Sequence, residues 1–99
     1  MEYALLLRDK AVAEIKLAYD WYEEQLNGLG ERFLHSVKQN SELILSNPKR
    51  FKTTYKNFKE IYLKEFPFVI VYFIDQTNAK IVIISVFHCS RNPKTKFKK

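Results

Sequence analysis

The side chains that could perform acid–base chemistry lie in the second half of this 99-residue sequence. One apolar stretch ends at His88 and is followed by Arg91, and the earlier stretch KEIYLK contributes Lys59, Tyr62 and Lys64. Cleaving RNA without a metal requires a general base, a general acid and cations that stabilise the charge growing on the phosphate. These five residues are therefore the catalytic candidates, provided that the strands carrying them are neighbours.

The stretch KEIYLK also has a purely structural interpretation. The two-residue period of a strand places Glu60, Tyr62 and Lys64 on one face and Lys59 on the other. The face of Tyr62 and Lys64 is the better candidate for a site open to solvent. It is equally compatible with an ordinary solvated strand surface.

His88 and Arg91 each have two possible roles. Strict alternation along the last apolar stretch places His88 on the side of Val82, Ile84 and Val86. This position favours a partly buried structural histidine over a catalytic one. The planar guanidinium of Arg91 either holds a phosphate or ties down the following turn through backbone carbonyls.

The last six residues, 94–99, read KTKFKK and predict a flexible basic tail. Its lysines could instead follow a phosphate backbone, each adding an attraction that depends on salt but not on base sequence. We expect contacts with a binding partner at Lys59, Lys64, Arg91 and Lys94.

The positive charge is concentrated in one half of the chain. Residues 1–47 carry five Lys/Arg and eight Asp/Glu, whereas residues 48–99 carry twelve Lys/Arg and three Asp/Glu, within a net charge of +6. Such asymmetry predicts a basic face for phosphates or for an acidic protein segment. A lysine-rich surface that only keeps the protein in solution is the alternative.

Other classes of site find little support in the sequence. The two histidines and the one cysteine do not have metal-ligand spacing, and no glycine-rich phosphate loop is present, so we expect no metal and no cofactor. Cys89 has no second cysteine with which to form a disulfide, which fits a reducing cytosol. The longest apolar run, 66–74, is too short to cross a bilayer, and the N-terminus lacks a signal-peptide pattern. We therefore expect a cytoplasmic protein.

The elements that position these side chains follow from hydrophobic periodicity. Apolar residues recur at helical spacing on both sides of NGLG, where the two glycines predict a hinge, and later the period shortens to that of strands. The predicted order is a strand at 3–7, a helix capped by Asp9 and reaching Leu26, a second helix ending at Asn47, and strands at 59–66, 67–75 and 80–88.

The predicted fold is α+β in a single domain spanning residues 1–99. An N-terminal strand precedes a two-helix antiparallel hairpin, and a three-stranded antiparallel meander completes a mainly antiparallel sheet, in the order β-α-α-β-β-β. The strands at 67–75 and 80–88 are apolar on both faces, so they are expected to be central and covered. The helices are expected to cover one of these faces.

Four blocks along the chain resemble the RelE/ParE superfamily of bacterial toxins. They are WYEEQLNGLGERFLHSV, NPKRF, YKNFKEIYLKEFPFVIVYFID and VFHCSRNPK, in the order and spacing of that family. The resemblance implies the toxin half of a type II toxin–antitoxin module, acting in the cytoplasm of a microbe and silenced by a cognate antitoxin.

The same resemblance implies two possible targets. Some members cut messenger RNA on the ribosome, and others poison DNA gyrase. The RNA-cutting members commonly carry arginines on the middle strands and an aromatic hydroxyl near the C-terminus, whereas KEIYLK lacks arginine and the last tyrosine is Tyr72. These departures favour a gyrase-directed toxin over an endonuclease using His88 and Arg91. A nucleic-acid-binding module without catalysis is the third possibility.

The resemblance also predicts the form of the antagonist. Antitoxins of this family typically join a DNA-binding part to a flexible segment that folds on the toxin. We expect this segment to be acidic and amphipathic, placing apolar side chains on the sheet and helices and carboxylates near Arg91, Lys59 and Lys64.

Overall fold

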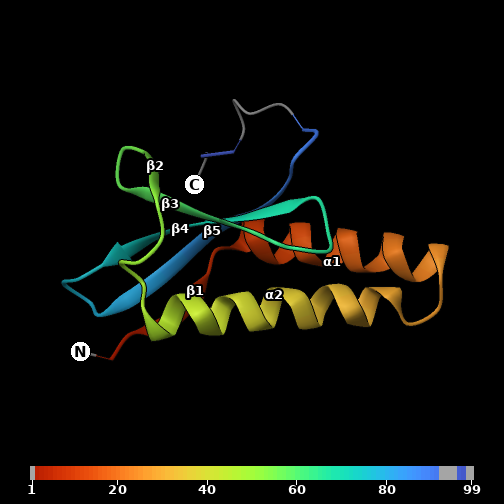
Figure 1. The fold of residues 1–99 in the computed structure, drawn as a ribbon, viewed down its shortest axis with the longest axis horizontal. Coiled ribbons are helices and arrows are strands. Elements are labelled where there is room, and N and C mark those ends of the chain that lie inside the picture. The colour runs from red at the N-terminus through yellow and green to blue at the C-terminus, as the bar shows by residue number, and fades with distance from the viewer. Residues whose placement is uncertain (1, 92–95, 98–99) are drawn as a thin grey trace.

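The computed structural model describes residues 2–91, 96 and 97 and consists of a two-helix hairpin packed on a five-stranded sheet (Figure 1). The α+β class and the predicted order are confirmed, with one short strand, β2, in addition. The elements are β1 (Ala4–Leu7), α1 (Asp9–Gln25), α2 (Leu29–Ser46), β2 (Thr53–Tyr55), β3 (Phe58–Tyr62), β4 (Phe68–Asp75) and β5 (Lys80–His88).

The strand order in the sheet is β1-β5-β4-β3-β2. The strands β2 to β5 form an antiparallel meander, and β1 adds to β5 in parallel, so the sheet is mainly antiparallel as predicted. The two strands that are apolar on both faces, β4 and β5, are the interior ones. Their position agrees with the composition, because interior strands of a covered sheet need apolar side chains on both sides.

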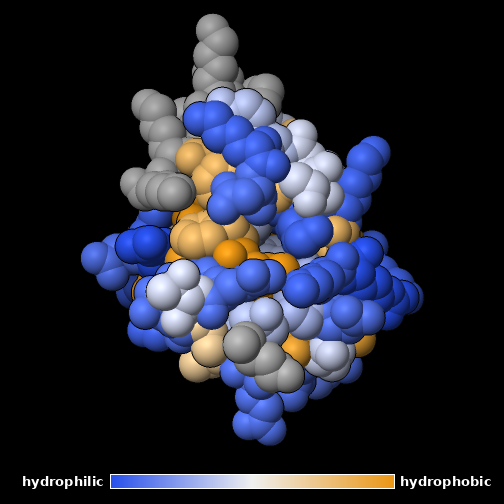
Figure 2. Space-filling view, turned by 90° about the vertical axis from the view of Figure 1, so that its left-hand side faces the viewer, coloured by the Kyte–Doolittle hydropathy of each residue, from blue (hydrophilic) through white to orange (hydrophobic). Residues whose placement is uncertain are grey.

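The main core lies between the sheet and the helices, which run side by side along one face (Figure 1). Phe33 and Ile44 of α2 and Ala11 of α1 are fully buried there against alternate residues of β4 and β5. From the end at which β4 turns into β5, apolar side chains gather near the middle of the molecule between hydrophilic ones (Figure 2).

A second apolar cluster covers the opposite face of the sheet, which we call the outer face. Its buried members are Phe58, Val69, Val71, Val82, Ile84 and Phe87. The ring of Phe97 stacks on Phe58 at 5.4 Å, and the ammonium of Lys96 lies 2.6 Å from the buried carboxylate of Glu60. At these two positions the structure differs from the expected flexible tail, because an aromatic ring and an ion pair join the segment to the sheet. Lys94 lies outside the described residues.

The hinge between the helices depends on a carboxylate and two glycines. Glu23 of α1 accepts hydrogen bonds from the backbone N–H groups of Gly28, Gly30 and Glu31, so it satisfies the first turn of α2 in place of an ordinary N-cap side chain. Gly28 has a φ of 92°, and a Cβ on Gly30 would stand 2.8 Å from the carbonyl oxygen of Tyr19. The helices therefore cross with no room for a side chain at position 30.

One detail of the predicted helix start is wrong. Asp9 is the first residue of α1, and the N-cap position is held by Arg8, which makes no side-chain capping bond. The Asp9 carboxylate instead lies in the first turn, where the positive end of the helix dipole favours it.

A buried tyrosine holds the segment between α2 and β2 against the sheet. The Tyr72 side chain is fully buried, and its hydroxyl donates a 2.8 Å hydrogen bond to the carbonyl of Pro48. Burial raises the pKa of Tyr72 to about 12, because the phenolate is poorly solvated there.

Replacing Tyr72 with Phe is expected to destabilise the fold by about 1–2 kcal/mol at pH 7, because the buried Pro48 carbonyl loses its donor. The raised pKa means that the folded state holds the phenol proton more tightly than the unfolded state does. The stabilisation is therefore present below pH 10 and is lost as the pH rises toward 12.

Urea unfolding of both proteins from pH 7 to 11.5 measures this difference in stability. The difference between wild type and Tyr72→Phe should shrink above pH 10. A difference that stays constant to pH 11.5 would contradict the assignment.

Candidate functional site

A carboxylate of α1 completes the hydrogen bonding of β5 where the neighbouring strand stops. β1 pairs with Lys80 to Ile83 of β5, and the chain then enters α1. Farther along β5, Glu14 Oε1 accepts hydrogen bonds from the backbone N–H of Val86 at 3.1 Å and from the hydroxyl of Ser85 at 2.8 Å. Helix α1 thus takes the place of a strand at this edge of the sheet.

A β-bulge lies next to this contact. Val71 of β4 faces Ser85 and the next residue, Tyr72, faces Ile83, so Ile84 is the extra residue. The bulge interrupts strict alternation along β5. Val82 and Ile84 belong to the outer face, whereas Val86 belongs to the core on the helix side.

Because of the bulge, the environment of His88 differs from the predicted one. Strict alternation places His88 with Val82 and Ile84, but its ring packs edge-on against Phe68 of the helix-side core, with ring centroids 4.9 Å apart. The extra residue in β5 shifts the alternation by one position, so the imidazole is directed toward α1.

His88 and Arg91 are brought together in a groove between α1 and the end of β5, which we call the α1 groove. Its volume is about 440 Å³. The residues that line it are Glu14, Leu17, Ala18, Trp21, Tyr22, Phe68, Val86, His88, Ser90 and Arg91. Most of its wall is apolar, and its polar groups lie near the end of β5.

The polar end of the groove is held by short-range hydrogen bonds. His88 Nδ1 accepts a 3.1 Å hydrogen bond from the backbone N–H of Ser90, and the Ser90 hydroxyl lies 2.7 Å from the same nitrogen. Since Nδ1 is an acceptor, neutral His88 carries its ring proton on Nε2. The backbone N–H of Arg91 donates to the His88 carbonyl at 3.0 Å, so the turn keeps both side chains at the groove.

The other three candidates lie in separate places. Lys59 donates to the carbonyl of Phe51 and to the hydroxyl of Thr53, both at 2.9 Å, so it ties β3 to the segment before it. Tyr62 is more than half exposed on the outer face, and its hydroxyl reaches Glu60 at 3.3 Å.

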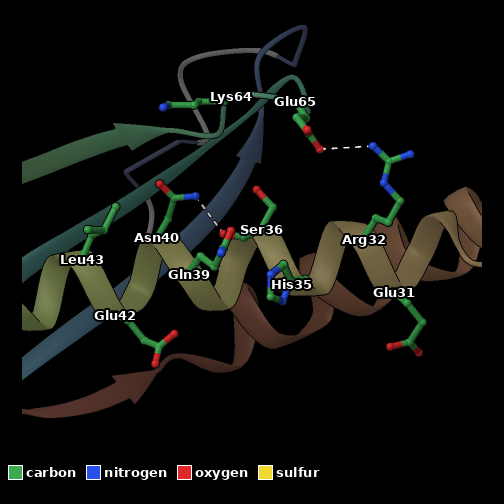
Figure 3. A pocket seen from close by; sticks show the side chains of 10 residues that line it. All are labelled: Glu31, Arg32, His35, Ser36, Gln39, Asn40, Glu42, Leu43, Lys64 and Glu65. Atoms are coloured by element: carbon green, nitrogen blue, oxygen red, sulfur yellow. Dashed lines mark hydrogen bonds and ion pairs between the residues drawn. The ribbon is translucent and has the colours of Figure 1, made fainter.

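Lys64 lies beyond the end of β3, so the prediction that it shares one strand face with Tyr62 is wrong. It lines a cleft of about 680 Å³ between α2 and the β3–β4 connection (Figure 3). Arg32 and Glu65 form an ion pair at 3.3 Å across this cleft, and Asn40 donates to the Ser36 carbonyl at 2.8 Å. We call it the α2 cleft. Apart from Leu43, its lining residues are of polar types, and they carry charges of both signs.

The structure therefore groups one pair of the five candidates, His88 with Arg91. Among residues 2–91, 96 and 97, no three His, Cys, Asp or Glu side chains converge as a metal site would require. Nor does the described part of the chain contain a helix long and apolar enough to cross a membrane.

Comparison with known proteins identifies the family. The family model of the ParE toxin of type II toxin–antitoxin systems, parDE, matches residues 5–93. The chain belongs to this family. A search of curated proteins found no significant match.

Solved structures show the same fold as this ParE-family chain at low sequence identity. The chromosomal ParDE system from P. aeruginosa contains a chain 18% identical, with a TM-score of 0.66, over 88% of this chain and 96% of that one. The intact E. coli RelBE complex gives 20% identity and a TM-score of 0.69, over 90% and 99%. The RelBE2 complex from Mycobacterium tuberculosis gives 17% and 0.64, over 89% and 99%.

Sequence analysis of this ParE-family chain missed three residues of the groove. Leu17 and Trp21 stand four residues apart on α1, outside the apolar stripe that packs on the core. This spacing places both side chains on one helix face and could have indicated a second apolar surface. Glu14 gave no signal, because a glutamate on an amphipathic helix ordinarily faces solvent.

Replacing Glu14 with Ala is expected to destabilise the protein by about 1–3 kcal/mol, since the Val86 N–H and the Ser85 hydroxyl lose their acceptor. Glu14→Gln keeps a side-chain oxygen at the same reach and should lose less than about 1 kcal/mol. Urea unfolding at pH 7 measures both changes. Equal losses in the two variants would show that this oxygen does not hold β5.

Proposed function

We propose that this chain is the toxin of a type II toxin–antitoxin module and that it arrests growth by binding an essential protein, DNA gyrase, rather than by cutting RNA. The observation that carries the proposal is the dispersal of the five catalytic candidates. They occupy the α1 groove, the outer face, the α2 cleft and the β2–β3 edge.

RNA cleavage needs its acid, base and cations around one phosphate. The ammonium of Lys59 is committed to two oxygens of its own chain. On the outer face, Tyr62 stands beside Glu60, whose carboxylate is paired with Lys96. The Lys96 ammonium is thereby committed to Glu60, and the surrounding cluster is apolar, so the described residues of this face do not surround a phosphate with cations. This dispersal supports a toxin that acts by binding.

One observation favours the endonuclease as a second candidate. His88 and Arg91 line the same groove, so a base and a cation are available there. Cleavage would still require a general acid for the leaving oxygen. The neighbouring hydroxyl of Ser90 is a poor proton donor at neutral pH, so this site would depend on a group of the ribosome or of the RNA.

A cognate antitoxin is the second part of the proposal. The structures named above are toxin–antitoxin complexes, and the second half of this chain carries most of its positive charge. An acidic segment that folds on binding suits such a surface, because it can cover a large area with a short chain. We place both proteins in the cytoplasm, where the proposed target works.

Induction of this protein in a bacterial host is expected to arrest growth while messenger RNA stays intact, and the purified chain is expected to stop gyrase from supercoiling relaxed plasmid. Sequencing of RNA 5′ ends within minutes of induction and a plasmid supercoiling assay measure the two effects. The double variant His88→Ala/Arg91→Ala is compared in both.

Three outcomes would contradict or redirect this proposal. New RNA ends at fixed positions within translated codons, lost in the double variant, would establish the endonuclease instead. Gel-shift binding to RNA without growth arrest would identify a nucleic-acid-binding module. Normal growth, intact RNA and active gyrase together would show that the chain is not a toxin.

A further inference from the structure

Strand β1 leaves one side of its backbone open along the rim of the sheet. β1 and β2 lie at opposite rims (Figure 1). The backbone N–H groups of Ala4 and Arg8 each donate a 2.9 Å hydrogen bond to a carbonyl on the β5 side, so the even-numbered residues direct their backbone toward β5. The N–H and C=O groups of Leu5 and Leu7 therefore point away from the sheet. Within the part of the chain that the structure describes, no further segment accepts or donates hydrogen bonds there.

β1 also lacks the features that ordinarily keep an edge strand from pairing. Edge strands are commonly protected by lysines, prolines or bulges. At the other rim, β2 has an irregular register between Thr53 and Tyr55 and is flanked by Lys52 and Lys56. β1 reads ALLL and pairs with β5 in a regular register. The β1 edge is therefore the rim to which another strand can add.

The exposed face of β1 is apolar at its centre. Leu5 and Leu7 pack on the helix-side core, so alternation directs Leu6 to the outer face, where it is 40% exposed. Leu6 is paired in register with Val82, a buried member of the outer-face cluster. Leu6 thus extends this cluster to the rim of the sheet, where it meets water.

A second copy of β1 fits this edge because the edge is complementary to itself. In an antiparallel pair with a two-fold axis at Leu6, the outward groups of Leu5 meet those of Leu7 in the other copy, and each such pair exchanges two hydrogen bonds. The two Leu6 residues then face each other at the axis as a non-hydrogen-bonded pair, in which side chains approach most closely. Pairing removes both from water.

The charges that flank this register are complementary as well. Alternation places Glu2 and Arg8 on the same side of the strand as Leu6. The two-fold register sets Arg8 opposite Ala4 of the other copy, so Glu2 of that copy is its diagonal neighbour, within reach of a long side chain. Both side chains are exposed, and neither has an ion pair among the described residues. The symmetry forms this contact twice.

We propose that the chain forms a dimer through β1, in which an antiparallel β1–β1 junction joins the two sheets into one. The strand contributes four residues from each copy, so the interface is small and the dimer is transient. The inference goes beyond the proposed function, because it concerns the chain alone and requires neither a target nor an antitoxin.

Sedimentation equilibrium over a range of protein concentrations measures the dimer. The salt concentration is held at about 0.15 M, where repulsion between two chains of net charge +6 is screened beyond about 8 Å. Amide hydrogen exchange, followed by NMR in dilute and concentrated samples, locates the contact. The amides of Leu5 and Leu7 should exchange more slowly in the concentrated sample, because they gain acceptors, while those of β2 should not change.

Variants of the exposed face test the register. Leu6→Lys sets two ammonium groups opposite each other at the axis and should raise the dimer dissociation constant about tenfold or more. Leu43→Lys on α2, where the leucine is 47% exposed, is the matched control and should change the constant less than about twofold. Circular dichroism confirms that each variant is folded.

A charge exchange tests the diagonal contact. Glu2→Lys and Arg8→Glu should each weaken the dimer, because each sets like charges next to one another across the axis. The double variant Glu2→Lys/Arg8→Glu should recover the wild-type dissociation constant within about twofold, because the exchanged charges attract again. Double-variant affinity no better than that of the single variants would contradict the register.

A chain that stays monomeric up to about 1 mM would overturn the inference. A dimer in which the Leu5 and Leu7 amides exchange as fast as in the dilute chain would also overturn it, because another surface would then join the copies. Protection of these amides only after addition of the protein encoded next to this gene would assign the β1 edge to that partner instead. Each of these outcomes leaves the proposed growth arrest and gyrase inhibition untouched, since those are measured separately.

Discussion

The hydrogen bond from the Val86 backbone to the Glu14 carboxylate joins α1 to β5 at the point where β1 ends. A buried strand edge without an acceptor would be costly, and the helix that follows β1 is close enough to supply one. This contact holds α1 beside the bulge of β5. The α1 groove, the orientation of His88 and the turn carrying Arg91 all depend on the relation between these two elements.

Three cations of the second half, all among the described residues, lie in separate parts of the fold. Lys59 stabilises the β2–β3 edge, Lys96 neutralises Glu60 on the outer face, and Arg91 stands at the α1 groove. Each cation is placed by a different part of the fold, and two of the three act within the chain. Such a distribution fits a protein that recognises other proteins by separate surface contacts better than one that surrounds a reacting phosphate.

Periodicity was enough to predict the helices and the central position of β4 and β5, because each has a strong apolar pattern, and the two glycines of NGLG predicted the hinge. The bulge could not be predicted. β5 is apolar on both faces, so shifting the alternation at Ile84 leaves the hydrophobic pattern unchanged. The roles of Glu14 and Glu23 were also invisible. Glu14 acts on a backbone group 72 residues away in sequence, and Glu23 acts across the glycine hinge on backbone groups that helical periodicity does not single out. The groove depends on the long-range contact of Glu14 and therefore emerged only from the structure.

The central claim is that the bulge directs His88 to the helix side of the sheet, and nuclear Overhauser effects from the His88 ring test it most directly. Cross-peaks to the ring of Phe68 are predicted, since the two rings meet edge-on with their centroids 4.9 Å apart. The Phe68 ring in turn packs edge-on against the ring of Tyr22 on α1, which lies on the helix side of the sheet. Cross-peaks from His88 to Ile84 or Val69 on the outer face would contradict the account and would remove His88 from the α1 groove.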